Sequence, residues 1–146
     1  MNIICVCTGN TCRSPMAAAL LNRALARRGL SLNVRSAGLV AREGEPASDQ
    51  AIRAMADRGL DLTRHRAHTI DEKDVQDALL VYMTRNHAIA LNARFPGART
   101  VLLTELAGQS GDIPDPYGGD KTVYAACADA LEALAERIAA LLARRG

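Results

Sequence analysis

Apolar positions along the chain fall into two kinds of segment that alternate from the N-terminus to the C-terminus. Short runs rich in aliphatic and β-branched residues predict strands at 2–7, 32–38, 77–84 and 98–103. Longer segments, with apolar residues three and four positions apart, predict helices at 14–28, 47–58, 85–95 and from Asp120 to the C-terminus. Strands that alternate with helices predict an α/β fold with a parallel sheet covered by helices on both faces.

Residues with special turn preferences mark the ends of these elements. Ser14 before Pro15 predicts the start of the first helix, with serine as its N-cap, and Gly29 predicts its end. The last helix carries an apolar stripe formed by Cys127, Leu131, Leu134, Ile138 and Leu141. The chain shows no internal repeat, low-complexity tract or linker, so we expect one domain over residues 1–146.

The composition is typical of a globular protein. Of the 146 residues, 49% are apolar, 23% are charged and only 3% are aromatic, which predicts an aliphatic core. The formal net charge of +2, with no cluster of Lys and Arg among aromatic residues, argues against nucleic-acid binding. The first apolar run is too short for a signal peptide and no stretch could span a bilayer, so we expect a cytoplasmic protein.

Three of the four cysteines, Cys5, Cys7 and Cys12, lie within eight residues, which does not resemble a secreted disulfide framework. Reduced thiols are therefore expected, and a thiolate could serve as a nucleophile. A zinc site is disfavoured, because there is no CxxC pair and the three histidines fall at no recognisable ligand spacing. Cys5 on a strand and Cys127 on the apolar stripe are expected to be core residues.

The segment from Cys7 to Arg13 joins the first predicted strand to the first helix, where parallel sheets bind ligands. Backbone N–H groups of such a loop can point inward and bind an anion beside the helix N-terminus. Gly9 and Asn10 permit the unusual backbone angles, and Arg13 offers a planar fork to two phosphate oxygens. Cys7 would lie beneath the anion as a thiolate, with Ser14 donating to its sulfur. This arrangement suits in-line attack on phosphorus and a phosphocysteine intermediate.

A polar loop at 107–120 follows the fourth predicted strand and should lie at the same edge of the sheet. Asp115 is its best candidate for a general acid, because Pro116 restricts its position and Tyr117 could form a wall of the cleft. It would protonate the leaving group and then activate the water that releases phosphate. Asp112 is expected to be solvated or to share this role weakly.

The string VCTGNTCRSPMA, together with DPYGG downstream, resembles the low-molecular-weight protein phosphatases, a small cysteine-dependent family usually called tyrosine phosphatases. RSAG at 35–38, the Gly-x-Pro-Ala segment at 44–47 and HRA at 65–67 extend the resemblance over nearly the whole chain. It implies a three-layer α/β/α fold with a four-stranded parallel sheet of Rossmann-like topology, and no metal or cofactor.

The resemblance also implies roles for individual residues. Cys7 would be the nucleophile, Arg13 the phosphate clamp and Asp115 the acid and base. The residues implied to contact substrate or phosphate, or to support the loop, are Thr8, Gly9, Asn10, Thr11, Cys12, Ser14 and Tyr117. Cys12 matches a second thiol of the family that can form a reversible disulfide with Cys7 and protect it from over-oxidation.

The loop departs from the tyrosine-specific pattern, which has aliphatic residues at the positions of Thr8 and Thr11. CTGNTCRSPMA is similar to the bacterial protein-arginine phosphatases of the same family, in which the threonine at position 11 is the distinguishing residue. A phosphoguanidinium is planar and rich in donors, so the Thr11 hydroxyl could accept from it or orient the attacking water. Phosphoarginine is therefore the favoured substrate, and phosphotyrosine is the alternative.

Two rival functions remain open. A thiol-dependent arsenate reductase would need further cysteines near the cleft, and there are none between Cys12 and Cys127. A non-catalytic phosphate-binding module would need neither Cys7 nor Asp115. The expected partners are phosphorylated proteins, with no nucleic acid and no membrane, and the expected state is a monomer. Residues away from the loop also carry expectations: a tie for a loop at His65, a core position at Tyr82, and a solvated helix start formed by Asp71, Glu72, Lys73 and Asp74.

Overall fold

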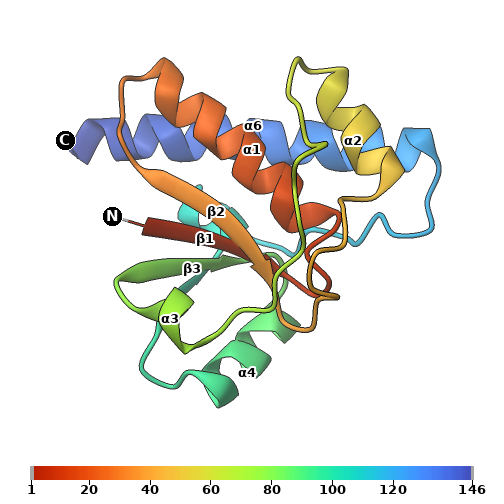
Figure 1. The fold of residues 1–146 in the computed structure, drawn as a ribbon. Helices are drawn as coiled ribbons and strands as arrows, with labels where there is room; N and C mark the ends of the chain where they lie inside the picture. The colour runs from red at the N-terminus through yellow and green to blue at the C-terminus, as the bar shows by residue number, and fades with distance from the viewer. Residues whose placement is uncertain (1, 146) are drawn as a thin grey trace.

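The computed structural model describes residues 2–145, and these form a sheet between two layers of helices (Figure 1). The strands are β1 (Asn2–Cys7), β2 (Asn33–Gly38), β3 (Ala78–Tyr82) and β4 (Arg99–Leu102). Their order is β2-β1-β3-β4, and all three pairings are parallel. The predicted three-layer α/β fold with a four-stranded parallel sheet is confirmed.

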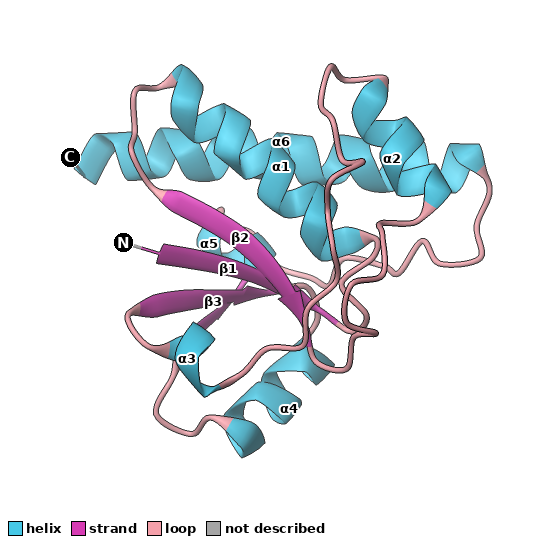
Figure 2. Cartoon of the chain, in the orientation of Figure 1, coloured by secondary structure: helices cyan, strands magenta, loops and turns pink. Residues whose placement is uncertain are grey.

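Helices cover both faces of this sheet (Figures 1 and 2). One face carries α1 (Arg13–Arg27), α6 (Lys121–Arg145) and, against α6, the shorter α2 (Asp49–Ala56). The other face carries α3 (Glu72–Val75) and α4 (Arg85–Arg94), while α5 (Leu103–Leu106) follows β4 directly. The helices predicted from the apolar spacing are all present, with ends that differ by a few residues. Within residues 2–145, no helix combines the length and the apolar character that crossing a membrane requires.

The core follows the alternation of side chains along the buried strands. In β1, Ile3 and Cys5 pack with α1 and α6, whereas Ile4 and Val6 pack on the opposite face. The predicted core position of Cys5 is confirmed, and its burial, together with the nearby Cys7, raises the pKa of its thiol to about 12. Cys5 therefore stays protonated and is not a nucleophile.

Ser14 is not the N-cap of the first helix, contrary to the sequence prediction. Helix α1 begins at Arg13, and the capping position belongs to Cys12, which makes no side-chain capping bond. Ser14 is fully buried one residue inside the helix. Its hydroxyl contacts the Cys7 sulfur at 2.9 Å, so it is not available to cap the helix.

Three further expectations are only partly met. Asp71 caps α3 as a helix start should, but Asp74 is buried and bonded to Arg35 at 2.6 Å, so this turn is not simply solvated. Cys127 and Tyr82 pack against the core but remain partly exposed. Burial is sufficient to raise the pKa of the Cys127 thiol to about 11.

Candidate active site

Cys7 ends β1 at the carboxyl edge of the sheet, and the loop 8–12 leads from it into α1 (Figure 2). Its Sγ lies 2.9 Å from the Ser14 Oγ in a buried contact. The Ser14 oxygen accepts from the Asn10 amide at 2.8 Å and has one proton to donate. The Ala37 carbonyl, 3.4 Å away, is the more distant acceptor. The Ser14 hydroxyl therefore donates its hydrogen bond toward the Cys7 sulfur. A hydroxyl that donates in this way is a suitable partner for a cysteine nucleophile.

Asn10 is the residue that holds the loop in shape. Its φ of 59° lies in the left-handed region, and its side chain is fully buried. The amide nitrogen donates to Ser14 and, at 2.9 Å, to the Ser36 hydroxyl of β2. The amide oxygen accepts from the His68 backbone N–H at 3.0 Å, and the Asn10 carbonyl lies 2.7 Å from the His65 Nε2. Burial lowers the pKa of His65, so its neutral ring donates here, and the predicted loop tie is confirmed.

Gly38, the last residue of β2, lies directly under the loop. A Cβ at this position would be 2.8 Å from the Thr8 carbonyl oxygen and 3.1 Å from both the Asn10 nitrogen and Cβ. Two of these three atoms belong to the main chain, which cannot move without distorting the loop.

Gly38→Ala should therefore lower the free energy of unfolding by about 1–3 kcal/mol through overpacking. The same displacement should weaken inorganic phosphate binding by about 10-fold, because the loop amides that would hold the anion shift together. Denaturant unfolding and phosphate titration measure the two effects. Gly97→Ala is the matched control, because its added Cβ would meet nothing within 4 Å. Equal stability and phosphate affinity of the two variants would contradict this interpretation.

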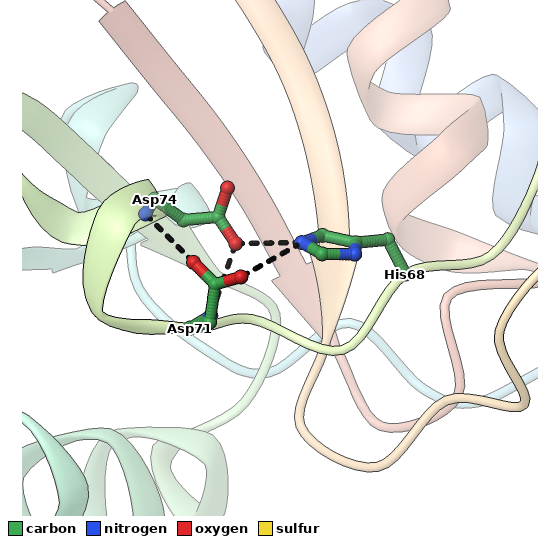
Figure 3. Close-up of side chains that lie close together, drawn as sticks. All are labelled: His68, Asp71 and Asp74. Carbon is green, nitrogen blue, oxygen red and sulfur yellow. Dashed lines mark hydrogen bonds and ion pairs between the residues drawn. The ribbon is translucent and has the colours of Figure 1, made fainter.

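His68, Asp71 and Asp74 form a polar cluster next to the residue whose backbone binds Asn10 (Figure 3). The His68 Nε2 lies 2.7 Å from Asp74 and 3.8 Å from Asp71, and its Nδ1 lies 3.3 Å from Glu43. Burial works to lower the pKa of His68, but the hydrogen bonds to Asp74 and Glu43 outweigh it, and the net shift is upward. Three potential metal ligands meet here, yet Asp74 is already bonded to the cationic Arg35. The cluster therefore acts as a support for the His68 backbone that holds Asn10.

The loop forms the floor of a pocket of about 220 Å³. Its lining comprises Cys7, Thr8, Gly9, Thr11, Cys12, Arg13, Asp115 and Tyr117. All of these were singled out from the sequence. Asn10 and Ser14, which the sequence also predicts to support the loop, are fully buried and shape the loop through their hydrogen bonds.

Arg13 and Asp115 both line this pocket and form an ion pair. The Arg13 side chain is 5% exposed, and its two terminal nitrogens lie 3.0 Å from the Ile113 carbonyl and 3.5 Å from the Asp115 carboxylate. The other Asp115 oxygen accepts from the Tyr117 N–H at 3.0 Å, and the carboxylate is half exposed. The Ile113 N–H donates to the Met83 carbonyl just beyond β3, so the 107–120 loop is fixed at the sheet edge where the sequence placed it.

Asp112 has a different environment. It is exposed, does not line the pocket, and accepts from the Arg85 backbone N–H at 3.0 Å at the start of α4. This bond links the 107–120 loop to the start of α4, so the Asp112 carboxylate has a structural role.

Cys12 lies in the pocket wall and contacts two hydroxyls that the sequence did not reveal. Its sulfur lies 3.1 Å from the Tyr124 hydroxyl and 3.6 Å from that of Ser48. Burial and the contact with Cys12 raise the pKa of Tyr124 to about 12, so the phenol remains protonated. Cys7 and Cys12 are both free thiols in the structure.

The sequence also gave no indication that His87 reaches the loop. Its Nε2 lies 3.0 Å from the Thr8 hydroxyl, although the two residues are 79 positions apart. The only local signal was the spacing of Thr84 and His87, which is typical of a capping box at a helix start.

Comparison with known proteins gives one consistent family. The sequence profile described as low molecular weight phosphotyrosine protein phosphatase matches residues 2–146. A protein-arginine-phosphatase of Geobacillus stearothermophilus is 42% identical, with 94% of this chain and 93% of that protein covered. The low molecular weight protein-tyrosine-phosphatase PtpB of Staphylococcus haemolyticus is 34% identical, with 85% and 87% covered. A solved structure of the YwlE arginine phosphatase, a mutant with a phosphorylated active-site serine, has a TM-score of 0.94 at 37% identity, covering 97% of this chain and 95% of that one.

Proposed function

The chain belongs to the low molecular weight phosphotyrosine protein phosphatase family, and from that premise we propose that it is a protein phosphatase that hydrolyses phosphoarginine side chains through a phosphocysteine intermediate. The observation that carries the proposal is the meeting of Cys7, Arg13 and Asp115 in one pocket. A nucleophile, an anion clamp and a proton donor are the groups that this hydrolysis requires.

The reaction has two steps. In the first, the Cys7 thiolate attacks phosphorus in line, the P–N bond of phosphoarginine breaks, and Asp115 protonates the departing guanidine. In the second, Asp115 takes a proton from a water that attacks the phosphocysteine, which releases inorganic phosphate and the thiolate. Arg13 and the loop amides neutralise the charge on the phosphoryl oxygens in both steps.

The hydroxyls of the pocket support phosphoarginine as the substrate. Thr11 lines the pocket, and its hydroxyl is only in a long 3.7 Å contact with the Cys12 sulfur, so it can pair with a substrate. The Thr11 carbonyl accepts from the Ser48 N–H at 3.0 Å, which fixes the residue in place. A guanidinium offers N–H donors to such a hydroxyl, whereas a phenyl ring offers none.

Phosphotyrosine is the second candidate substrate, and Tyr117 is the residue that favours it. Its side chain is 80% exposed on the pocket wall, where it could stack against a substrate ring. The relative PtpB is also named a tyrosine phosphatase.

Thr11→Ile should change the substrate preference. We expect the ratio of kcat/KM for a phosphoarginine peptide to that for a phosphotyrosine peptide to fall by about 10- to 100-fold, because the hydroxyl is replaced by an apolar wall. The two peptides should share one sequence, and their hydrolysis is followed by phosphate release. Thr11→Ser keeps the hydroxyl and should keep the ratio. An unchanged ratio in Thr11→Ile would mean that Thr11 does not determine the substrate preference. A wild type that prefers the phosphotyrosine peptide would support the second candidate substrate.

The proposal extends to a monomeric, cytoplasmic enzyme of one domain over residues 1–146 that acts on phosphorylated proteins without a metal or cofactor. Catalysis without a metal or cofactor is supported by the side chains that supply the nucleophile, the clamp and the proton donor in the pocket. Full phosphatase activity of a monomeric fraction after treatment with a chelator is the expected result.

A further inference from the structure

The contact between Thr8 and His87 joins the pocket wall to helix α4 and has no part in the two steps above. Thr8 lines the pocket, and the His87 Nε2 lies 3.0 Å from the Thr8 hydroxyl. His87 is 4% exposed, and it is not among the residues that line the pocket. The histidine therefore meets the loop from behind, through Thr8.

The bonds around the imidazole determine which nitrogen carries its proton. The His87 Nδ1 lies 3.1 Å from the Thr84 backbone N–H, which can only donate. In a neutral ring Nδ1 must then accept, and the proton lies on Nε2. Consequently the imidazole donates to the Thr8 oxygen.

The charge state of the ring agrees with this assignment. Burial, and then the positive charge of Arg13, lower the pKa of His87 to about 4, although Asp112 and Asp115 act in the opposite direction. The ring is therefore neutral in neutral solution. With a pKa of about 4 and no position in the pocket lining, His87 is poorly suited to transfer a proton in the reaction.

A bond from His87 has a direct consequence for Thr8. A hydroxyl has one proton and two lone pairs, and the imidazole occupies one lone pair. The Thr8 proton cannot be given to His87, so it remains for an acceptor in the pocket. The opposite tautomer would take that proton and leave only lone pairs facing a bound phosphoryl group, which is repulsive.

We propose that His87 is a positioning residue that holds Thr8 as a hydrogen-bond donor toward the bound phosphoryl group. This inference rests on the proposed function, because it takes the ligand of the pocket to be a phosphoryl group. Thr8 then adds a side-chain donor to the amides of the loop and to Arg13. The role is separate from that of Thr11, which concerns the organic part of the substrate.

Binding of inorganic phosphate to the full chain tests the proposal without turnover. Thr8→Val removes the hydroxyl and should weaken phosphate binding by about 10-fold, and His87→Leu should do the same. The double variant Thr8→Val/His87→Leu should be no weaker than either single one, because both changes remove the same bond. Losses that multiply in the double variant would overturn the proposal.

Two further variants separate positioning from stability. His87→Gln can accept from the Thr84 N–H and still donate to Thr8, so phosphate affinity should return to within about threefold of wild type. Thr84→Ala removes the hydroxyl cap of α4 and should cost stability of about 1 kcal/mol, with phosphate affinity unchanged. If His87→Gln binds phosphate as weakly as His87→Leu, the proposal is wrong.

The tautomer itself is open to nitrogen-15 NMR of labelled protein. The expected spectrum shows a neutral His87 protonated at Nε2, and protonation at Nδ1 would overturn the inference whatever the activity. The wild type could bind phosphate and carry the expected His87 tautomer but hydrolyse neither phosphopeptide. That result would overturn the proposed function and leave the role of His87 standing.

Discussion

Replacing Cys7 with serine should reduce the turnover of a phosphoarginine peptide by at least about 10⁴-fold and leave the affinity for inorganic phosphate within a few-fold of wild type. A serine hydroxyl is a weak nucleophile unless a base takes its proton, and Asp115, the carboxylate of the pocket, is the group that protonates the leaving group in the first step. The hydroxyl closest to the sulfur, that of Ser14, is set to donate, and His87 is turned toward Thr8. The loop amides and Arg13 remain, so phosphate should still bind.

Phosphate release in single-turnover reactions measures the first effect, and phosphate titration measures the second. Cys127→Ser is the matched control, because this thiol is partly buried and its pKa is raised to about 11, so its loss should leave turnover within about twofold. A Cys7→Ser protein that keeps more than a few per cent of wild-type turnover would exclude the phosphocysteine route.

Asp115→Asn should lower kcat for phosphoarginine peptides by about 10²- to 10³-fold. The neutral amide cannot protonate the leaving guanidine, whose pKa lies above ~12 against about 10 for a phenol. Asparagine matches aspartate in shape, and its amide oxygen can still accept from the Tyr117 N–H. An aryl phosphate with an acidic phenol needs less protonation, so its loss should be smaller, about 10-fold.

The two substrates should be compared at one pH with saturating concentrations of each. Asp112→Asn is the control, because its amide oxygen can keep the bond to the Arg85 N–H and it does not line the pocket, so its kcat should stay within about threefold. Equal losses of Asp115→Asn on both substrates would mean that the carboxylate shapes the pocket and does not transfer a proton.

Local patterns in the sequence were sufficient to predict the fold and the floor of the site. The apolar alternation of β1 and the spacing along α1 and α6 depend on neighbours in the chain, so both could be predicted directly. The position of Cys7, Arg13 and Asp115 at one edge followed from the rule that parallel strands end together. Family resemblance added the redox role of Cys12 and the distinguishing position of Thr11.

What could not be predicted depends on contacts between distant segments. Ser14 precedes a proline and matches a helix cap, yet the tertiary contact with Cys7 decides its use. His87, Tyr124 and His68 reach the loop from segments far along the chain, where no local pattern distinguishes a pocket neighbour from an ordinary core or surface residue. Each of them is positioned by packing, which the local sequence does not encode.

The dependence of Asn10 on Ser36, His65 and His68 also bears on how the chain acquires activity as it folds. The first strand and helix could form early from local interactions, but their connection has no fixed shape until β2 and the segment 39–68 have packed against it. During refolding or synthesis, phosphate binding should therefore appear together with the long-range contacts and not with the early helical signal. A nascent chain that ends before residue 68 would contain every residue from Cys7 to Arg13 and still be inert.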